Sequence, residues 1–252
     1  MTLRPDWTGS APGIPDGSRG ILAVMPLHAV TAVYGEQGLR ARLAIETGQL
    51  PVAAREKVGQ ALELAARVHA ADRRQTEPYL NHPLRVALRI ICHYDVRDTG
   101  IICAALLHDA VEDHAADLAA GGRPAALAAL AGRFGPDVAA LVEAVTNPDD
   151  ADGEATDERY RAHVAAALED SPRARVIKVS DFTDNGVGLH YTSGPKAVRL
   201  ARKYAPLVPV LTDLVTRPDT PLSPGARERI CRQLRDAGER FAAIASRPPG
   251  EP

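Results

Sequence analysis

The sequence predicts an all-α protein, with a single compact helical domain over residues 36–245. Of the 252 residues, 45% are hydrophobic but only 4% are aromatic, so Ala, Leu, Val and Ile must build the core. Most segments of this region repeat apolar residues at three- and four-residue spacing, which is typical of amphipathic helices. The sequence has neither a glycine-rich phosphate loop nor a clear strand–turn–strand pattern.

Residues 1–35 are expected to form a disordered leader. Pro and Gly recur through the first twenty residues and leave no periodic apolar face. The apolar stretch Ile21–Val33 contains Pro26, is too short to span a membrane and does not follow a basic segment, so it makes a poor signal peptide. Residues 246–252 are expected to form a disordered tail.

Between the leader and the tail, nearly every segment is expected to be helical. The expected helices are 51–72, one starting near Pro83, 99–107, 124–133, 136–146, 157–168, 196–215 with interruptions at Pro206 and Pro209, and an amphipathic helix at about 224–245. The helix 99–107 is apolar nearly all round and has Asp98 or Thr99 as a cap, so we place it at the centre. Residues 175–179 are β-branched enough for a strand, but Ser171-Pro172 is a good helix start, and we predict a helix there.

The charge balance and the cysteines exclude several classes of protein. The chain has 30 basic and 32 acidic residues without a block of like charge, which argues against an electrostatic nucleic-acid binder. Cys92, Cys103 and Cys231 are widely spaced, so we expect neither a disulfide framework nor a cysteine metal site. With no membrane-spanning run either, we expect a cytoplasmic protein without a membrane partner, and the oligomeric state stays open.

The most informative motif is His108-Asp109 followed by Glu112-Asp113, at the end of the most hydrophobic helix. On one continuous helix these four side chains fit within roughly 140° of arc. Three carboxylates placed together repel one another unless a positive charge lies among them, and a divalent metal ion would supply it. Taken alone, the motif is equally consistent with a helix end that emerges into solvent.

Two other segments add candidate ligands to this motif. His82 lies directly before the helix expected from Pro83, and Asp181 follows the apolar segment 176–179, with Asn185 one turn beyond. A mixed nitrogen and oxygen ligand set without sulfur suits Mn²⁺, Fe²⁺, Co²⁺ or Zn²⁺, and such a set would consist of His82, His108, Asp109 and Asp181. Glu112 and Asp113 would then be free to orient and deprotonate a water molecule.

In this order, the residues resemble the HD superfamily of metal-dependent phosphohydrolases. The resemblance is closer to the hydrolase domain of the RelA/SpoT alarmone enzymes and to the stand-alone small alarmone hydrolases. It extends over a motif core of about residues 52–215, and the matching segments are 68–69, 73–74, 77–87, 104–113, 134–138, 141–146, 176–181 and 204–207. It implies an all-helical HD-type domain.

The resemblance also implies a role for each matching residue. Metal ligands, usually for Mn²⁺, would be His82, His108, Asp109 and Asp181, and the pair that activates water would be Glu112 and Asp113. Arg73 and Arg74 would lie beside the nucleotide, and Asn185 would contact the substrate. The implied reaction removes the 3′-pyrophosphate of ppGpp or pppGpp and releases pyrophosphate with GDP or GTP. Lys178 is a further candidate for a phosphate contact, and a solvated lysine is an equal alternative.

The chain departs from the family pattern just after Asp181. The family usually has Arg-x-His-Asn there, whereas this chain has Phe182-Thr183-Asp184-Asn185. The change removes a positive charge and adds the Asp184 carboxylate close to the expected site. Two alternatives therefore stay open: an HD phosphohydrolase for another nucleotide, such as an adenine alarmone, or for a phosphomonoester; and a degenerate HD protein that binds a ligand without turnover.

Two further histidines lie near these motifs. His69 falls on the apolar stripe of its helix, so we expect it to pack in the core. His114 follows the acidic pair, and we expect it to face solvent.

Overall fold

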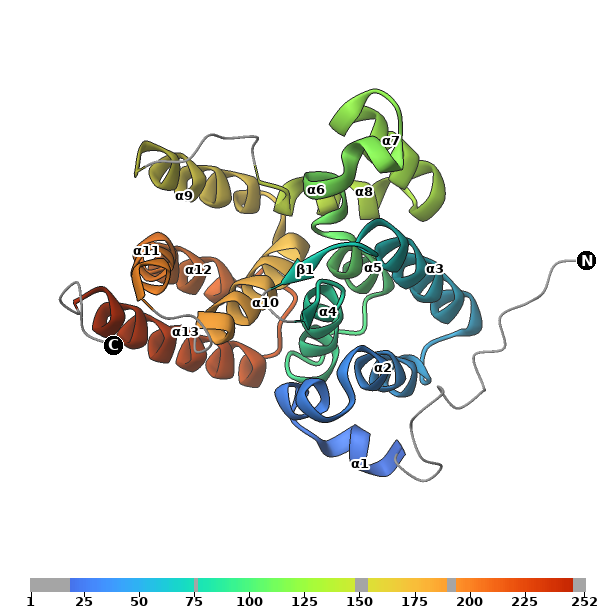
Figure 1. Ribbon diagram of the computed structural model, residues 1–252, viewed down its shortest axis with the longest axis horizontal. Coiled ribbons are helices and arrows are strands. Elements are labelled where there is room, and N and C mark those ends of the chain that lie inside the picture. Colours follow the sequence, from blue (N-terminus) through green and yellow to red (C-terminus); the bar gives the residue numbers. More distant parts are fainter. Residues whose placement is uncertain (1–18, 75–76, 148–153, 190–193, 247–252) are drawn as a thin grey trace, which may run out of the picture.

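The computed structural model describes residues 19–74, 77–147, 154–189 and 194–246. In these residues the elements are thirteen α-helices and one short two-stranded sheet, which confirms the all-α prediction (Figure 1). The helices are α1 (Arg19–Val24), α2 (Leu27–Thr47), α3 (Val52–Val68), α4 (Asn81–Cys92), α5 (Thr99–Leu107), α6 (Ala110–Leu118), α7 (Gly122–Phe134), α8 (Pro136–Val145), α9 (Glu154–Glu169), α10 (Pro172–Gly188), α11 (Gly194–Tyr204), α12 (Leu207–Thr216) and α13 (Pro224–Ala245).

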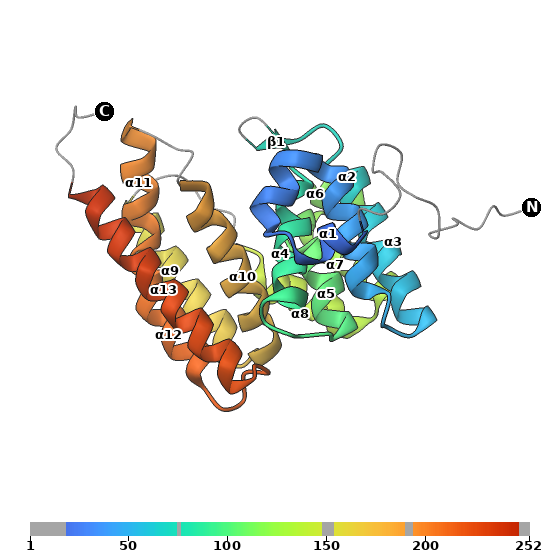
Figure 2. The ribbon, with the colours of Figure 1, turned by 90° about the horizontal axis from the view of Figure 1, so that it is seen from below.

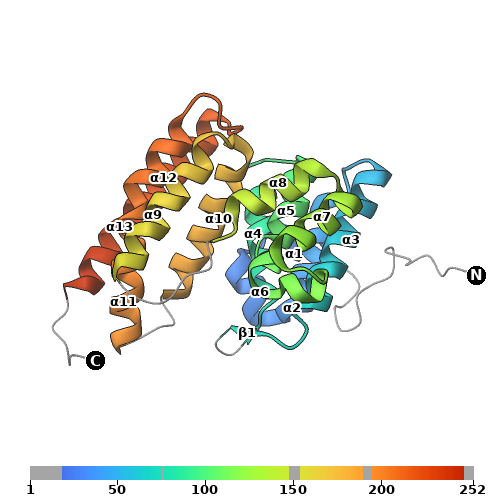
Figure 3. The same cartoon turned by 90° about the horizontal axis from the view of Figure 1, so that it is seen from above.

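The helices form two groups with α10 between them (Figure 2). Helices α1–α8 make the first group, and α9, α11, α12 and α13 make the second, as the view from above also shows (Figure 3). Helix α10 packs against α4, α5 and α8 on one side and against α9, α12 and α13 on the other. Residues of α10 can therefore contact helices of both groups.

Helix α5 lies at the centre of the first group, as the sequence predicts. Every residue from Ile101 to Leu107 is buried, and the helix packs against α3, α4 and α8. The Asp98 side chain caps its N-terminus by accepting a hydrogen bond from the Ile101 backbone N–H at 2.9 Å. Since a helix buried on all sides tolerates only apolar residues, the sequence Ile-Ile-Cys-Ala-Ala-Leu-Leu dictates this position.

Among the described residues, the structure contains no helix that is both long and apolar enough to pass through a membrane.

The expectation of a disordered leader is wrong for residues 19–35. These residues form α1 and the start of α2, and Leu22, Leu27 and Val30 are buried in the core. Pro26 precedes α2 as its N-cap rather than interrupting it, so the apolar stretch that follows forms a helix. Arg42 of α2 donates hydrogen bonds to the backbone oxygens of Leu22 and Met25 and so fastens α1 to the core. Residues 1–18 and 247–252 of the expected leader and tail lie outside the described residues.

The segment Pro172–Gly188 is helical, so the structure confirms a helix over residues 175–179 rather than a strand. A short antiparallel hairpin was not expected: β1 (Arg73–Arg74) pairs with β2 (Glu77–Pro78), with Arg73 opposite Pro78. Two residues per strand are too few to give an alternating apolar pattern, which explains why the sequence did not predict strands there. The expected interruption at Pro206 is confirmed, because α11 ends at Tyr204 and Pro206 is the N-cap of α12. The expected interruption at Pro209 is wrong, because Pro209 lies in the first turn of α12, where proline is tolerated.

Candidate metal centre

The HD motif lies at a break between two helices rather than on one helix. Helix α5 ends at Leu107, His108 and Asp109 form a turn, and α6 begins at Ala110. The expectation that His108, Asp109, Glu112 and Asp113 share one face of a continuous helix is therefore wrong. The apolar run needed to bury α5 ends at Leu107, where the polar residues begin.

The turn and two distant helices bring the four expected ligands together. His82 comes from α4 and Asp181 from α10. Nε2 of His82 lies 3.3 Å from Oδ1 of Asp181 and 3.6 Å from Oδ2 of Asp109. Nε2 of His108 lies 3.1 Å from the same Asp109 oxygen and 3.8 Å from the same Asp181 oxygen. We refer to these four residues as the His–Asp cluster.

The His–Asp cluster requires a positive charge at its centre. Nδ1 of His108 is 2.9 Å from the backbone oxygen of Ala105 and donates to it, so Nε2 holds the lone pair of the neutral ring. This buried Nε2 has no hydrogen-bond partner in the described residues, although it faces two carboxylates. Burial lowers the pKa of His108, but the charges of Asp109 and Asp181 outweigh it and raise that pKa well above its usual value. A proton or a cation must therefore lie there, and the donor set fits a divalent transition-metal ion.

Asp184 explains one of the departures from the family pattern. Its carboxylate is buried and accepts a hydrogen bond from Nδ1 of His82 at 2.8 Å. Two arginines of α4 neutralise it, since Arg85 and Arg89 each approach Asp184 Oδ1 at 3.0 Å. The carboxylate thus lies on the far side of the His82 ring from the His–Asp cluster. It fixes the ring so that Nε2 faces Asp109 and Asp181, and a carboxylate on the second ring nitrogen is the usual arrangement around a metal-binding histidine.

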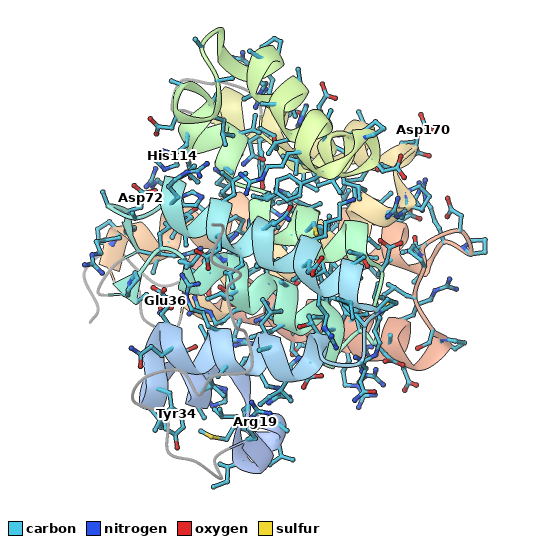
Figure 4. The ribbon with its side chains drawn as sticks, turned by 90° about the vertical axis from the view of Figure 1, so that its right-hand side faces the viewer. Arg19, Tyr34, Glu36, Asp72, His114 and Asp170 are labelled. Carbon is cyan, nitrogen blue, oxygen red and sulfur yellow. The ribbon has the colours of Figure 1, made fainter. Side chains whose placement is uncertain are left out.

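The exchange of Asp184 for Asn is expected to weaken Mn²⁺ binding about 10- to 100-fold, because the neutral amide accepts more weakly from His82 Nδ1. A titration of the metal-free protein with Mn²⁺ measures this change. The control is Asp170→Asn, at an exposed aspartate next to the end of α9 (Figure 4). Equal Mn²⁺ affinities for the two variants would show that Asp184 does not position His82.

Phe182 explains the other departure, because it belongs to the core. It is buried and makes edge-to-face contacts with Tyr204 of α11 and Phe241 of α13, each with ring centroids 5.9 Å apart. The positive charge next to Asp181 comes from Lys178 instead, whose Nζ lies 3.3 Å from Asp181 Oδ2. Lys178 is only 5% exposed, so the alternative of a solvated lysine is wrong.

The acidic pair lies in the first turn of α6. Both oxygens of Glu112 accept hydrogen bonds from Asn147, one from its backbone N–H at 2.8 Å and one from its Nδ2 at 3.0 Å. Asn147 Oδ1 also accepts from Lys178 at 3.4 Å, which links Glu112 to the lysine beside Asp181. Burial and the negative charges of Asp109 and Glu112 raise the pKa of Asp113 to about 6.

Sequence reasoning missed Asn147 and Tyr79. The Tyr79 hydroxyl donates to Asp109 Oδ2 at 2.8 Å, and so holds one carboxylate of the cluster. Tyr79 lies three residues before His82 inside a segment that matches the family, which was a usable signal. Asn147 follows α8 and had no such signal, because its contact with Glu112 joins residues 35 positions apart.

Two of the expected substrate-binding residues, Asn185 and Arg74, connect the cluster to the hairpin. Nδ2 of Asn185 donates to Asp181 Oδ1 at 2.7 Å, and Arg74 Nη2 donates to Asn185 Oδ1. Arg73, next to it on β1, is exposed. A chain of hydrogen bonds therefore leads from Asp181 through Asn185 to the hairpin. Arg74 takes part in this chain, whereas the exposed Arg73 is accessible to a ligand.

The comparison with protein families decides what kind of domain this is. A model described as "HD domain" matches residues 61–202, more than half of the chain, and this match contains the whole His–Asp cluster. The chain belongs to the HD-domain family. The resemblance expected from the sequence is thereby confirmed.

Curated relatives of this chain have names that describe an activity. The chain is 35% identical over 132 residues to the guanosine-3′,5′-bis(diphosphate) 3′-pyrophosphohydrolase MESH1 of Drosophila melanogaster, covering 51% of this chain and 67% of that protein. It is 38% identical over 126 residues to human MESH1, covering 48% and 63%. It is 35% identical over 158 residues to a guanosine-3′,5′-bis(diphosphate) 3′-pyrophosphohydrolase of Aquifex aeolicus, covering 60% of this chain but only 21% of that protein. The chain thus spans about two thirds of the MESH1 proteins and about a fifth of the Aquifex protein.

A solved structure resembles three quarters of this chain. It is that of a metazoan ortholog of SpoT that is described as hydrolysing ppGpp and as having a role in starvation responses. The two structures superpose with a TM-score of 0.58 at 25% sequence identity, covering 75% of this chain and 98% of the other.

Proposed function

We propose that this protein is a metal-dependent 3′-pyrophosphohydrolase that converts ppGpp and pppGpp to GDP and GTP with release of pyrophosphate. The observation that carries the proposal is the convergence of His82, His108, Asp109 and Asp181 around Nε2 of His108, which has no hydrogen-bond partner in the described part of the chain. The names of the MESH1 relatives and the description of the SpoT ortholog support this substrate. The partner is then a small-molecule nucleotide, and the proposed compartment is the cytoplasm.

The proposed ion is Mn²⁺, with Fe²⁺, Co²⁺ and Zn²⁺ as alternatives that suit the same donors. When bound, the ion supplies positive charge that lowers the pKa of a coordinated water molecule and offsets the charge of phosphate oxygens. The protein's own contribution is to fix the ligands. Tyr79 holds Asp109, Asn185 and Lys178 hold Asp181, and Asp184 holds His82.

In this proposal, Glu112 and Asp113 orient the attacking water molecule and accept its proton. Asn147 holds both oxygens of Glu112 and so fixes the direction of its carboxylate. Asp113 has a pKa of about 6, so it is mostly ionised at neutral pH and can accept a proton. Arg73 and Arg74 would bind the nucleotide, since a guanidinium group both stacks on a base and pairs with phosphate. Lys178, which lies beside Asp181, would place a positive charge close to the phosphate groups of the substrate.

The alternatives that the sequence left open have less support. Phe182 lies in an aromatic contact among α10, α11 and α13, and Asp184 lies behind His82, so neither change removes a ligand. The proposal predicts a higher kcat/KM for ppGpp than for the matching adenine alarmone or for a phosphomonoester. Steady-state assays with the three compounds at saturating Mn²⁺ test this order. An equal or higher value for either competitor would favour another substrate.

The pH dependence of the reaction tests the role of Asp113. We expect kcat/KM to fall as the pH drops below about 6, because the protonated carboxyl group cannot accept a proton from water. The measurement requires Mn²⁺ concentrations at which the midpoint no longer depends on the metal, because ligand protonation also reduces activity in acid. Asp113→Asn should lower the activity and remove this titration. An unchanged midpoint in Asp113→Asn would assign the titration to another group.

A further inference from the structure

A second group of ligand atoms lies where the end of α3 meets α6. His69 caps the C-terminus of α3, Asp72 follows three residues later, and His114 belongs to α6. Oδ2 of Asp72 lies 2.8 Å from Nδ1 of His69 and 2.6 Å from Nε2 of His114. One ligand atom from each residue lies within 4.8 Å of the other two. Asp72 and His114 are neighbours at the edge of the molecule in Figure 4, so the expectation that His114 simply faces solvent is wrong.

The two imidazole rings of this group are held in place from outside it. Nδ1 of His114 lies 2.9 Å from Oδ2 of Asp117, and a carboxylate on the second ring nitrogen is typical of metal-binding histidines. His69 is 3% exposed, and its ring stacks on Tyr79 with centroids 4.7 Å apart. His69 is therefore a packed residue, as expected, but its Nδ1 faces a carboxylate rather than the apolar core. The rings are fixed with one nitrogen each directed at the same Asp72 oxygen.

Hydrogen bonds alone satisfy this group only with an extra proton. Both ring nitrogens of His114 face carboxylates, so a metal-free His114 must carry a proton on each. A divalent cation can replace the Nε2 proton, because it binds the lone pairs of both imidazoles and the Asp72 carboxylate at once. Burial lowers the pKa of His69, which leaves its ring neutral at neutral pH and able to offer a lone pair.

We propose that His69 Nδ1, Asp72 Oδ2 and His114 Nε2 form a second divalent-cation site, separate from the His–Asp cluster. Two imidazole nitrogens and one carboxylate oxygen suit Zn²⁺ or Co²⁺, whereas Mg²⁺ and Ca²⁺ prefer oxygen ligands. Three protein ligands leave at least one position for water. The cation ties the residue before Arg73 to the helix that carries Glu112 and Asp113, and so stiffens the junction between them.

Zinc stoichiometry tests this proposal without any assay of hydrolysis. The full chain is stripped with a chelator, loaded with Zn²⁺, dialysed and measured by mass spectrometry of the metal. We expect about two Zn²⁺ per chain for the wild type and about one for His114→Ala. His108→Ala, which removes a ligand of the first cluster, should also keep about one, and the double variant almost none. The matched control is His93→Ala, at the exposed histidine that caps α4, which should bind as the wild type does.

The proposal would be overturned if the wild type bound one Zn²⁺ per chain, His114→Ala also bound one, and His108→Ala bound none. The group would then be a hydrogen-bonded triad only. Asp72→Asn supplies the same test if His114→Ala does not fold, as judged by its helical circular dichroism. His108→Ala lacks a residue of the His–Asp cluster, so Zn²⁺ bound to this variant reports on the second site alone. The test is therefore independent of the proposed function. One Zn²⁺ retained by His108→Ala supports the second site even if the wild type does not hydrolyse ppGpp.

Discussion

His108→Ala is expected to lose the bound metal of the His–Asp cluster and the hydrolase activity together. The substitution removes the buried Nε2 that faces Asp109 and Asp181, and leaves these carboxylates with one imidazole fewer between them. We expect ppGpp hydrolysis to fall to the level of the chelated wild type, because the remaining ligands cannot offset the phosphate charge. Mn²⁺ titration and an assay of pyrophosphate release measure the two losses.

His93→Ala is the matched control for this prediction. His93 caps the C-terminus of α4 as His108 caps that of α5, but it is exposed. Its replacement should leave Mn²⁺ affinity and turnover unchanged. Activity retained by His108→Ala at Mn²⁺ concentrations that saturate the wild type would show that the cluster is not the catalytic metal site.

Glu112→Gln is expected to have the opposite pattern, with metal binding retained and turnover reduced. The glutamine keeps an oxygen for one of the two hydrogen bonds from Asn147 but cannot accept a proton from water. General acid–base groups contribute about 10²- to 10⁴-fold to a rate, so we expect a loss of kcat in that range. Steady-state kinetics at saturating Mn²⁺, with metal content measured on the same samples, separate the two effects.

Two outcomes would contradict this division of roles. A loss of metal equal to that of His108→Ala would place Glu112 among the ligands. An unchanged kcat would leave the proton transfer to Asp113 alone. Asn147→Ala gives an independent check, because it removes the Nδ2 hydrogen bond to Glu112 but keeps the one from the backbone N–H and leaves the charge of Glu112 unchanged. We expect an intermediate loss of kcat.

Local sequence patterns predicted most of the helices, and the order of the motifs predicted which candidate ligands lie close together. The continuous apolar run of residues 101–107 has only one stable environment, the centre of a helical protein, and α5 lies there. The helix capped by Asp98 and the helix from Pro136 have signals within one turn of their ends. His82, His108, Asp109 and Asp181 were recognised as a set from their order along the chain, and the structure brings each imidazole Nε2 to between 3.1 and 3.8 Å from a carboxylate oxygen of both aspartates.

The parts that sequence reasoning missed depend on contacts between distant residues. Asp184 was expected beside the metal as an added charge, but it meets His82 from 102 positions away and is neutralised by Arg85 and Arg89. The leader was read as disordered from its Pro and Gly content, whereas Leu22 and Val30 are stabilised by burial that only the folded core provides. The turn at His108–Asp109 was missed because helical periodicity by itself does not mark where one helix ends and another begins.

The release of pyrophosphate from ppGpp tests the central claim most directly. Purified protein is incubated with ppGpp and Mn²⁺, beside a sample treated with a chelator, and the products are separated by ion-exchange chromatography. We predict GDP and pyrophosphate in equal amounts with Mn²⁺ and unchanged ppGpp in the chelated sample. Intact ppGpp in the presence of protein shown to contain Mn²⁺, or single phosphates in place of pyrophosphate, would contradict the proposed function.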